Sequence, residues 1–296
     1  METNFEIVKV AGDLHFPEGP AYDGKGNLYV SNCNSDYVTK VDATGEISVA
    51  FRANLTEGEP LTFKKTNGMA FYKDGSLFAC DFGRNVIIRI SMDGAQEIYA
   101  ENYEGVPFRG PNDLAFDPHG NLYFTDPAGS DKEPIGAIYR VDVGTKKVAK
   151  VAGGMRFPNG LAFTADAKTL YVCESHLNRM VRFDVHQDGT LGEIEHFATL
   201  GEIEESFPDG MAVDVQGNLW IAHYMSGTVV VVSSEGAILQ RIPIPGGTKD
   251  GPTNVEFAGA DMKTLYVTHP GDNALFKFQT EIAGIDLFCA PNNIGS

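Results

Sequence analysis

One phrase recurs six times along the chain, and this repeat limits the folds that the sequence can adopt. Each copy has a polar residue, a short alternation of apolar and polar residues, a turn, and a second apolar run in which Leu precedes an aromatic residue. The polar residues that open the copies are spaced by 49, 45, 47, 50 and 45 residues. A regular period of this length is typical of arrays of one small supersecondary unit. The copies occupy residues 16–32, 66–81, 111–126, 158–174, 208–223 and 253–269.

The pattern within each copy predicts a β-hairpin. Alternating apolar and polar residues lead into an Asp/Gly turn, after which a second strand pattern begins. A further pair of strand-like runs follows the hairpin, as in residues 38–51, 86–100 and 180–197. Four short strands per repeat form one blade of a propeller. We therefore predict an all-β chain, a six-bladed β-propeller of four-stranded antiparallel blades around a central channel, with residues 1–296 as a single domain.

The two ends of the chain are expected to lie at the last blade. The segment FEIVKVAGDLHFPEG at the start resembles KVAKVAGGMRFPNG, in which the first part is the outermost strand of the preceding blade. By this alignment Phe5–Val10 completes blade six and removes an exposed sheet edge. The tail from Ile282 is expected to cap the outside of the ring.

Composition excludes several classes of partner. The chain has 23 Lys and Arg against 40 Asp and Glu, a net charge of −17, whereas nucleic-acid binding requires a basic surface. The start lacks the pattern of a signal peptide, and the longest wholly apolar run is Val229–Val232. Four scattered cysteines favour reduced thiols. We predict a cytoplasmic protein, a monomer or weak homo-oligomer, that binds neither nucleic acid nor membrane.

The residue that opens each copy carries a side-chain oxygen in all six cases. Because the first strand of each blade lines the channel, these side chains are expected to converge at one mouth. Two carboxylates and several amides suit a hard cation, Ca²⁺ above all, with Mn²⁺, Mg²⁺ or Zn²⁺ as substitutes. An alternative is that Asn and Asp only form turns, although Glu18 is a poor turn residue. The six are Glu18, Asn67, Asn112, Asn159, Asp209 and Asn254.

A second polar position lies 14 or 15 residues later in every copy. If residues 18 and 32 face each other across the hairpin, both positions lie at the same mouth. The second set could supply a base or orient the first, and Asp126 and Asp81 are its best acid–base candidates. The alternative is a set of solvated hairpin ends. Its members are Asn32, Asp81, Asp126, Glu174, His223 and His269.

Two common kinds of catalytic motif are missing from the sequence. It contains no GxSxG nucleophile motif and no GxGxxG fingerprint after a strand. Any chemistry is therefore expected to be metal-assisted, with a cation that polarises an ester-like carbonyl while a carboxylate activates water.

Four motifs in order carry a resemblance to a known family. They are PEGP at 17–20, RGPND at 109–113, FPNGLAF at 157–163 and PDGMAVD at 208–214. The sequence resembles the senescence marker protein/gluconolactonase family, also called regucalcin-like, across all six blades. This resemblance implies lactone hydrolysis with Ca²⁺ or a similar ion. It further implies that Glu18, Asn159 and Asp209 bind the metal, that Asn112 lies near it, and that Arg109 contacts the substrate.

The resulting hypothesis is a metal-dependent lactonase that opens a sugar-type or other small lactone, with Asp209 as general base and Asp126 as the alternative. Segments 53–65 and 127–136 lack counterparts in sugar-lactone members and are expected to shape the pocket. The alternatives are a Ca²⁺-dependent aryl-ester or organophosphate hydrolase and a non-catalytic Ca²⁺-binding scaffold.

Overall fold

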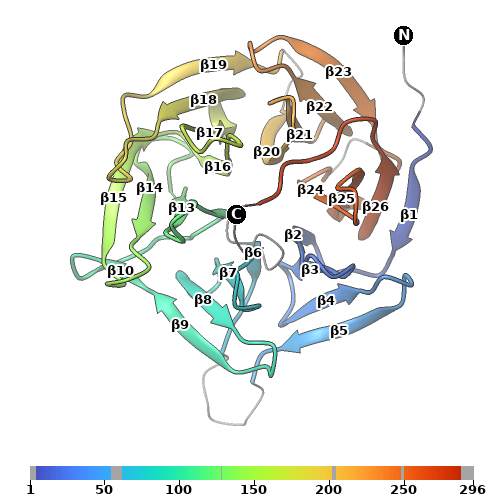
Figure 1. The fold of residues 1–296 in the computed structure, drawn as a ribbon, viewed down its shortest axis with the longest axis horizontal. Coiled ribbons are helices and arrows are strands. Elements are labelled where there is room, and N and C mark those ends of the chain that lie inside the picture. The colour runs from blue at the N-terminus through green and yellow to red at the C-terminus, as the bar shows by residue number, and fades with distance from the viewer. Residues whose placement is uncertain (1–4, 55–61, 128, 202–204, 248–249, 288–296) are drawn as a thin grey trace.

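The chain forms six four-stranded antiparallel sheets arranged in a ring, as the computed structural model shows (Figure 1). The structure describes residues 5–54, 62–127, 129–201, 205–247 and 250–287. Each four-stranded sheet is one blade, and in five of the six blades the strands run in chain order from the centre to the rim. The predicted six-bladed β-propeller is confirmed.

The blades follow the sequence repeats. Blade one comprises β2 (Pro17–Tyr22), β3 (Leu28–Asn32), β4 (Tyr37–Val41) and β5 (Ile47–Arg52). Blade two comprises β6 (Thr66–Phe71), β7 (Leu77–Asp81), β8 (Val86–Ile90) and β9 (Gln96–Ala100). Blade three comprises β12 (Leu114–Phe116), β13 (Leu122–Asp126), β14 (Gly136–Val141) and β15 (Val148–Met155). A small hairpin of β10 (Asn102–Tyr103) and β11 (Val106–Pro107) precedes blade three.

Blades four to six continue the same order. Blade four comprises β16 (Pro158–Phe163), β17 (Thr169–Glu174), β18 (Arg179–Asp184) and β19 (Glu195–Thr199). Blade five comprises β20 (Phe207–Val213), β21 (Leu219–Tyr224), β22 (Thr228–Val232) and β23 (Ile238–Pro243). Blade six comprises β24 (Asn254–Ala258), β25 (Thr264–His269), β26 (Ala274–Gln279) and β1 (Val8–Ala11). The helical segments in the described ranges are two 3₁₀ turns, Ser175–Leu177 and Pro270–Asp272, and neither is long enough to span a membrane.

The start of the chain closes the ring, as predicted. Strand β1 pairs antiparallel with β26, with Val8 opposite Lys277 and Lys9 opposite Phe276. Just before it, Phe5 packs against Phe278 with ring centroids 4.8 Å apart. The first and last parts of the chain therefore share one sheet, which covers the edge that β26 would otherwise expose.

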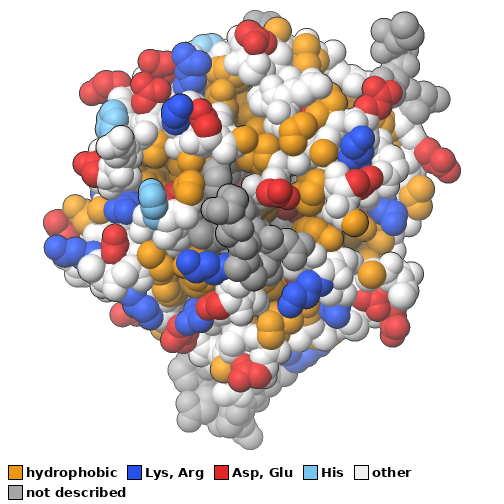
Figure 2. Space-filling model, in the orientation of Figure 1, with side chains coloured by type: hydrophobic (Ala, Val, Ile, Leu, Met, Phe, Trp, Pro, Cys, Tyr) orange, Lys and Arg blue, Asp and Glu red, His pale blue; other side chains and the backbone are white. Residues whose placement is uncertain are grey.

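The end of the chain corrects the expectation that the tail caps the outside. Residues 281–287 turn inward across one face of the ring (Figure 1), where Gly284 forms a β-bridge with Asp214. The amide of Ile285 donates to the carbonyl of Val213 at 3.0 Å, and its side chain packs between blades at 7% exposure. Figure 2 shows acidic and basic side chains interspersed around the rim of this face. The described part of the tail thus covers one end of the central channel.

Apolar contacts between neighbouring blades form the core. The clusters of buried side chains each combine residues from adjacent blades. Trp220 of blade five, for example, lies 5.7 Å from the ring of Phe257 and 6.4 Å from that of Phe278, both in blade six. Each blade therefore buries its faces against its two neighbours, which fixes the directions of the inner strands.

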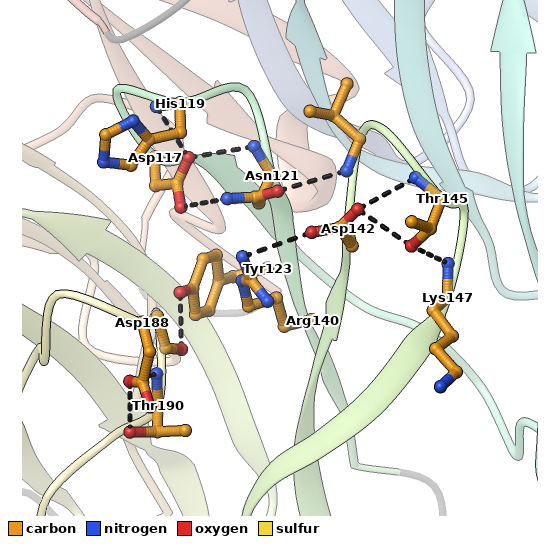
Figure 3. Close-up of polar contacts among 12 residues, drawn as sticks. Asp117, His119, Asn121, Tyr123, Arg140, Asp142, Thr145, Lys147, Asp188 and Thr190 are labelled. Atoms are coloured by element: carbon orange, nitrogen blue, oxygen red, sulfur yellow. Dashed lines mark hydrogen bonds and ion pairs between the residues drawn. The ribbon is translucent and has the colours of Figure 1, made fainter.

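A buried aspartate fixes the inner hairpin turn of blade three. Asp117 accepts hydrogen bonds from the amides of His119 and Asn121 and, at 2.7 Å, from the side-chain amide of Asn121 (Figure 3). Asp23 and Asp214 bind their own turns in the same way. The repeated Asp-x-x-Gly-Asn pattern is thus a structural motif, located where each first strand ends and the second begins.

This motif yields a stability prediction. Replacing Asp117 with Ala leaves two amides and the Asn121 side chain without their acceptor, so we expect the free energy of unfolding to fall by about 2 kcal/mol. Chemical denaturation measures the change. His119→Ala is the matched control, because only its backbone amide contacts Asp117. Equal stability of the two variants would refute the role assigned to Asp117.

Candidate active site

The two inner strands of a blade pair one residue out of the predicted register. Pro17 lies opposite Asn32, whereas Glu18 lies opposite Ser31. The same offset holds in other blades, where Thr66 pairs with Asp81 and Pro158 with Glu174. The expectation that residues 18 and 32 face each other is therefore wrong. A shift of one residue matters because successive side chains in a strand point to opposite sides.

The second polar position anchors the loops that lead into the first strands. Asn32 accepts from the amide of His15 at 2.9 Å, and Asp81 accepts from that of Lys64 at 2.8 Å. Glu174 accepts from the amide of Arg156 at 2.7 Å. Burial raises the pKa of Asp81 to about 6. Of the histidines at this position, His269 contacts the carbonyl of Gly247 in the loop before β24, whereas His223 contacts the side chain of Asn178 in blade four.

A pocket of about 320 Å³ lies at the other end of the channel from the tail. Five of the six residues predicted to converge line it, and they come from five different blades: Glu18, Asn67, Asn112, Asn159 and Asp209. Each of them stands at or just before the beginning of a first strand. The repeat therefore brings these side chains together, as the sequence indicated.

Blade six contributes Thr253 to the pocket in place of Asn254. The amide of Thr253 donates to the carbonyl of Thr268 at 3.0 Å, just as the amide of Asn112 donates to that of Thr125 at 2.9 Å. Thr253 is also four residues before Phe257, the spacing that separates Asn112 from its own phenylalanine. The assignment of Asn254 to the ring of oxygen donors is corrected by one residue.

Asn254 and Asp113 lie one layer deeper in the channel. Both line the cavity below the pocket, and each accepts from the amide of its own following residue, Leu114 or Val255. Burial raises the pKa of Asp113 to about 7. A second polar layer therefore supports the pocket floor, and one of its members, Asn254, had been predicted to belong to the first.

Two carboxylates at the pocket floor repel each other. Glu18 is 5% exposed, and its one backbone contact is a 3.2 Å hydrogen bond from the amide of Gly19. Burial, and after it the carboxylate of Asp209, raise the pKa of Glu18 well above its ordinary value. Burial and the charge of Asp113 raise the pKa of Asp209 in the same direction. A positive charge between these groups would reduce the electrostatic repulsion between the carboxylates.

The donor set fits a hard cation. Within the described ranges, no three His, Cys, Asp or Glu side chains gather closely enough to hold a metal ion by themselves. A cation at this floor would therefore need amide oxygens beside Glu18 and Asp209. Asn159 offers one, because its amide nitrogen is turned toward the hydroxyl of Ser175 at 3.2 Å. Oxygen-only ligands of this kind are those that Ca²⁺ accepts.

Arg109 and Asp126 do not line the pocket. The carboxylate of Asp126 accepts from the amides of Arg109 and Gly110 at 3.0 and 2.7 Å, and burial raises its pKa. The Arg109 side chain is exposed. Asp126 therefore holds the loop before Asn112, in the way that Asp81 and Glu174 hold theirs.

Of the two segments expected to shape the pocket, 127–136 acts on it indirectly, and no described residue of either segment lines it. Residues 55–61 and 128, which belong to them, lie outside the described ranges. The hydroxyl of Ser130 accepts from the amide of Phe157 at 2.9 Å, and Phe157 lines the pocket. The sequence reasoning missed the aromatic lining altogether, although a phenylalanine stands two residues before Glu18, Asn159 and Asp209.

The carboxylate pair yields a prediction that needs no ligand. In a buffer with chelator at pH 8, Asp209→Asn removes one buried charge, so we expect a thermal midpoint higher by roughly 2–4 °C. A carboxyl whose folded pKa is raised destabilises the fold as pH rises from its unfolded value through the folded one. The gain should therefore shrink at pH 5. A midpoint lowered equally at both pH values would contradict the repulsion.

Comparison with known proteins places these features in context. The family model described as "SMP-30/Gluconolactonase/LRE-like region" matches residues 16–270. Lactonase drp35 of Staphylococcus haemolyticus is 29% identical over 275 residues, which cover 86% of this chain and 79% of the relative. Diisopropyl-fluorophosphatase of Loligo vulgaris is 28% identical, covering 98% of this chain and 96% of that protein.

Solved structures agree with these sequence matches. A gluconolactonase from Xanthomonas campestris superposes with a TM-score of 0.79 at 28% identity, covering 93% of this chain and 89% of that one. A regucalcin from Agrobacterium tumefaciens, at 21% identity and a TM-score of 0.80 with 97% of each chain covered, shares the fold. The family model spans most of the chain and all four motifs noted in the sequence, so this protein belongs to the SMP-30/gluconolactonase/LRE-like family.

Proposed function

We propose that this protein is a metal-dependent hydrolase that opens small lactones, with one divalent cation, Ca²⁺ above all, bound by Glu18, Asn112, Asn159 and Asp209. The observation that carries the proposal is the convergence of Glu18 and Asp209 with three asparagine side chains in one pocket. The raised pKa of each carboxyl group agrees with a site that favours a positive charge. Family membership supports the reaction class, because its similar members include a lactonase and a gluconolactonase.

The bound cation would supply a positive charge that polarises the lactone carbonyl. The chain's own residues prepare this chemistry. Glu18 and Asn159 lie in different blades, so the rigid packing of the ring fixes their separation. The hydroxyl of Ser175 fixes the Asn159 amide by accepting from its nitrogen, and itself donates to the carbonyl of Pro208 at 2.6 Å. Preorganised donors of this kind avoid reorganisation during the reaction.

Asp209 is the stronger candidate for the general base. Its side chain lines the pocket, whereas the carboxylate of Asp126 is held by two loop amides. In the proposed reaction a water attacks the lactone carbonyl and passes a proton to Asp209. The acyl–oxygen bond of the ring then breaks, and the proton goes to the departing alkoxide. One water is consumed and a hydroxy acid is formed.

A second candidate function is hydrolysis of organophosphates or aryl esters. It is favoured by the squid diisopropyl-fluorophosphatase, which aligns with 98% of this chain. The same floor could act on a phosphoryl centre, because the cation and the carboxylate need only a polarisable oxygen and a leaving group.

A substrate panel with and without chelator tests the proposal. We expect acid release from small lactones in a pH-stat assay with Ca²⁺, loss of at least nine-tenths of that rate in EDTA, and recovery when Ca²⁺ is restored. Faster release from diisopropyl fluorophosphate or a phenyl ester than from every lactone would favour the second function. Ca²⁺ binding without turnover of any substrate would instead support a non-catalytic Ca²⁺-binding scaffold.

A single substitution tests the ligand assignment. Glu18→Gln removes the more buried of the two pocket carboxylates, so we expect Ca²⁺ binding, measured by calorimetry, to weaken and kcat/KM to fall at least about a hundredfold. Glu101→Gln is the matched control, since Glu101 is exposed and lies outside the pocket. Unchanged Ca²⁺ affinity in Glu18→Gln would remove Glu18 from the ligand set.

A further inference from the structure

Rings form the wall of the pocket above the two carboxylates. Three of these rings stand at one repeat position, two residues before the first-strand residues Glu18, Asn159 and Asp209. The others stand at the end of the second strand of blade five or just after the second strands of blades two and four. The six aromatic residues are Phe16, Phe82, Phe157, His176, Phe207 and Tyr224.

Part of this wall is continuous. The ring of His176 lies between those of Phe157 and Phe207, with centroid distances of 5.0 and 5.3 Å. Phe82 is 38% exposed on another side of the pocket. Large apolar side chains left open at a concave site mark a surface that a ligand covers.

Two of the aromatic residues have an unfavourable backbone conformation. Phe16 and Phe157 have φ values of 56° and 58°, in the left-handed region that bulky residues rarely adopt. The loop imposes this conformation, because Lys65 has a φ of 57° at the same position of blade two. Strain of this kind concentrates at functional sites. Glycine would avoid it, and in blades one and four a phenylalanine that lines the pocket occupies the position instead.

The hydroxyl groups that line the pocket are already bonded within the protein, so partners for substrate hydroxyls are limited to amide side chains, His176 and the two carboxylates. Among the described lining residues, Glu18 and Asp209 are the acidic side chains and none is Lys or Arg. Tyr224 donates its hydroxyl to Asp250 at 3.0 Å, and that of Ser175 is donated to Pro208. A substrate hydroxyl that is buried against the rings without a partner weakens binding.

We propose that this pocket selects lactones that carry a planar apolar substituent, such as a phenyl group, over polyhydroxylated sugar lactones. The catalytic part of this inference rests on the proposed lactonase function, whereas the binding preference does not. A phenyl group would stack on the Phe157–His176–Phe207 wall while the lactone carbonyl faces the carboxylate floor. Aromatic contacts and apolar burial both favour this arrangement.

Two matched substrate pairs test the preference in the presence of Ca²⁺. With γ-phenyl-γ-butyrolactone against γ-butyrolactone, we expect kcat/KM to rise at least about tenfold for the phenyl compound. With D-glucono-1,5-lactone against δ-valerolactone, we expect kcat/KM to be lower for the sugar. A sugar lactone preferred over δ-valerolactone, or no gain from phenyl, would overturn the inference.

Binding of unreactive analogues separates this inference from the proposed function. We expect 5-phenyl-2-pyrrolidinone to bind at least about tenfold more tightly than 2-pyrrolidinone in calorimetry. If no lactone is hydrolysed but this difference is found, the proposed function fails and the preference stands. If the two lactams bind equally, the preference fails whatever the activity.

A variant pair locates the effect. Phe157→Leu keeps an apolar side chain but loses the flat ring, so we expect the phenyl advantage to fall at least about threefold. The control is Phe197→Leu on β19, the outermost strand of the same blade, where the ring packs against Tyr171 outside the pocket. Equal losses in both variants would assign the effect to stability and contradict the aromatic wall.

Discussion

The close approach of six first strands around one axis is the constraint on which the rest of the structure depends. Neighbouring strands are joined directly, since the amide of Gly68 donates to the carbonyl of Asn112 and that of Gly210 to the carbonyl of Thr253, both at 2.8 Å. A Cβ at Gly68 would lie 2.1 Å from the Asp113 side chain, and one at Gly210 equally close to that of Asn254. Glycine directly after the site residue therefore lets the blades meet.

This crowding explains the electrostatics of the site. One polar side chain near the start of each first strand points toward the axis. Carboxylates and amides from five blades therefore meet in a single pocket. Glu18 and Asp209 are held by the whole ring and cannot move apart without disturbing the packing between blades. The fold thus maintains a repulsive pair, which is the electrostatic condition for cation binding and for a carboxylate that can accept a proton.

The residues around the pocket have different structural roles. Asp81, Asp126 and Glu174 bind the amides of the loops that enter the first strands. The loop that Glu174 holds carries the ring of Phe157, and the corresponding loop that Asn32 holds carries that of Phe16, so these two anchors also fix part of the wall. At the opposite end, the described tail covers the channel with Ile285, which leaves the pocket as the open end. Loops thus position the site residues and supply much of the ring-lined wall, whereas the strands supply the charged floor.

The sequence by itself determined the architecture and most of the charged floor. The repeat, the strand alternation and the Asp/Gly turns are local patterns, and their period places one residue of each blade at the same height in the ring. Glu18, Asn159 and Asp209 could therefore be grouped before any coordinates. Register could not be read in this way, because a shift of one residue leaves the alternation intact while it exchanges the two sides of a strand. For that reason Thr253 and Asn254 were confused, and Asp126 was expected in the pocket. Only the tertiary structure decided which side chains face one another, where the tail runs and that rings from blades four and five form one wall, since these depend on contacts between blades.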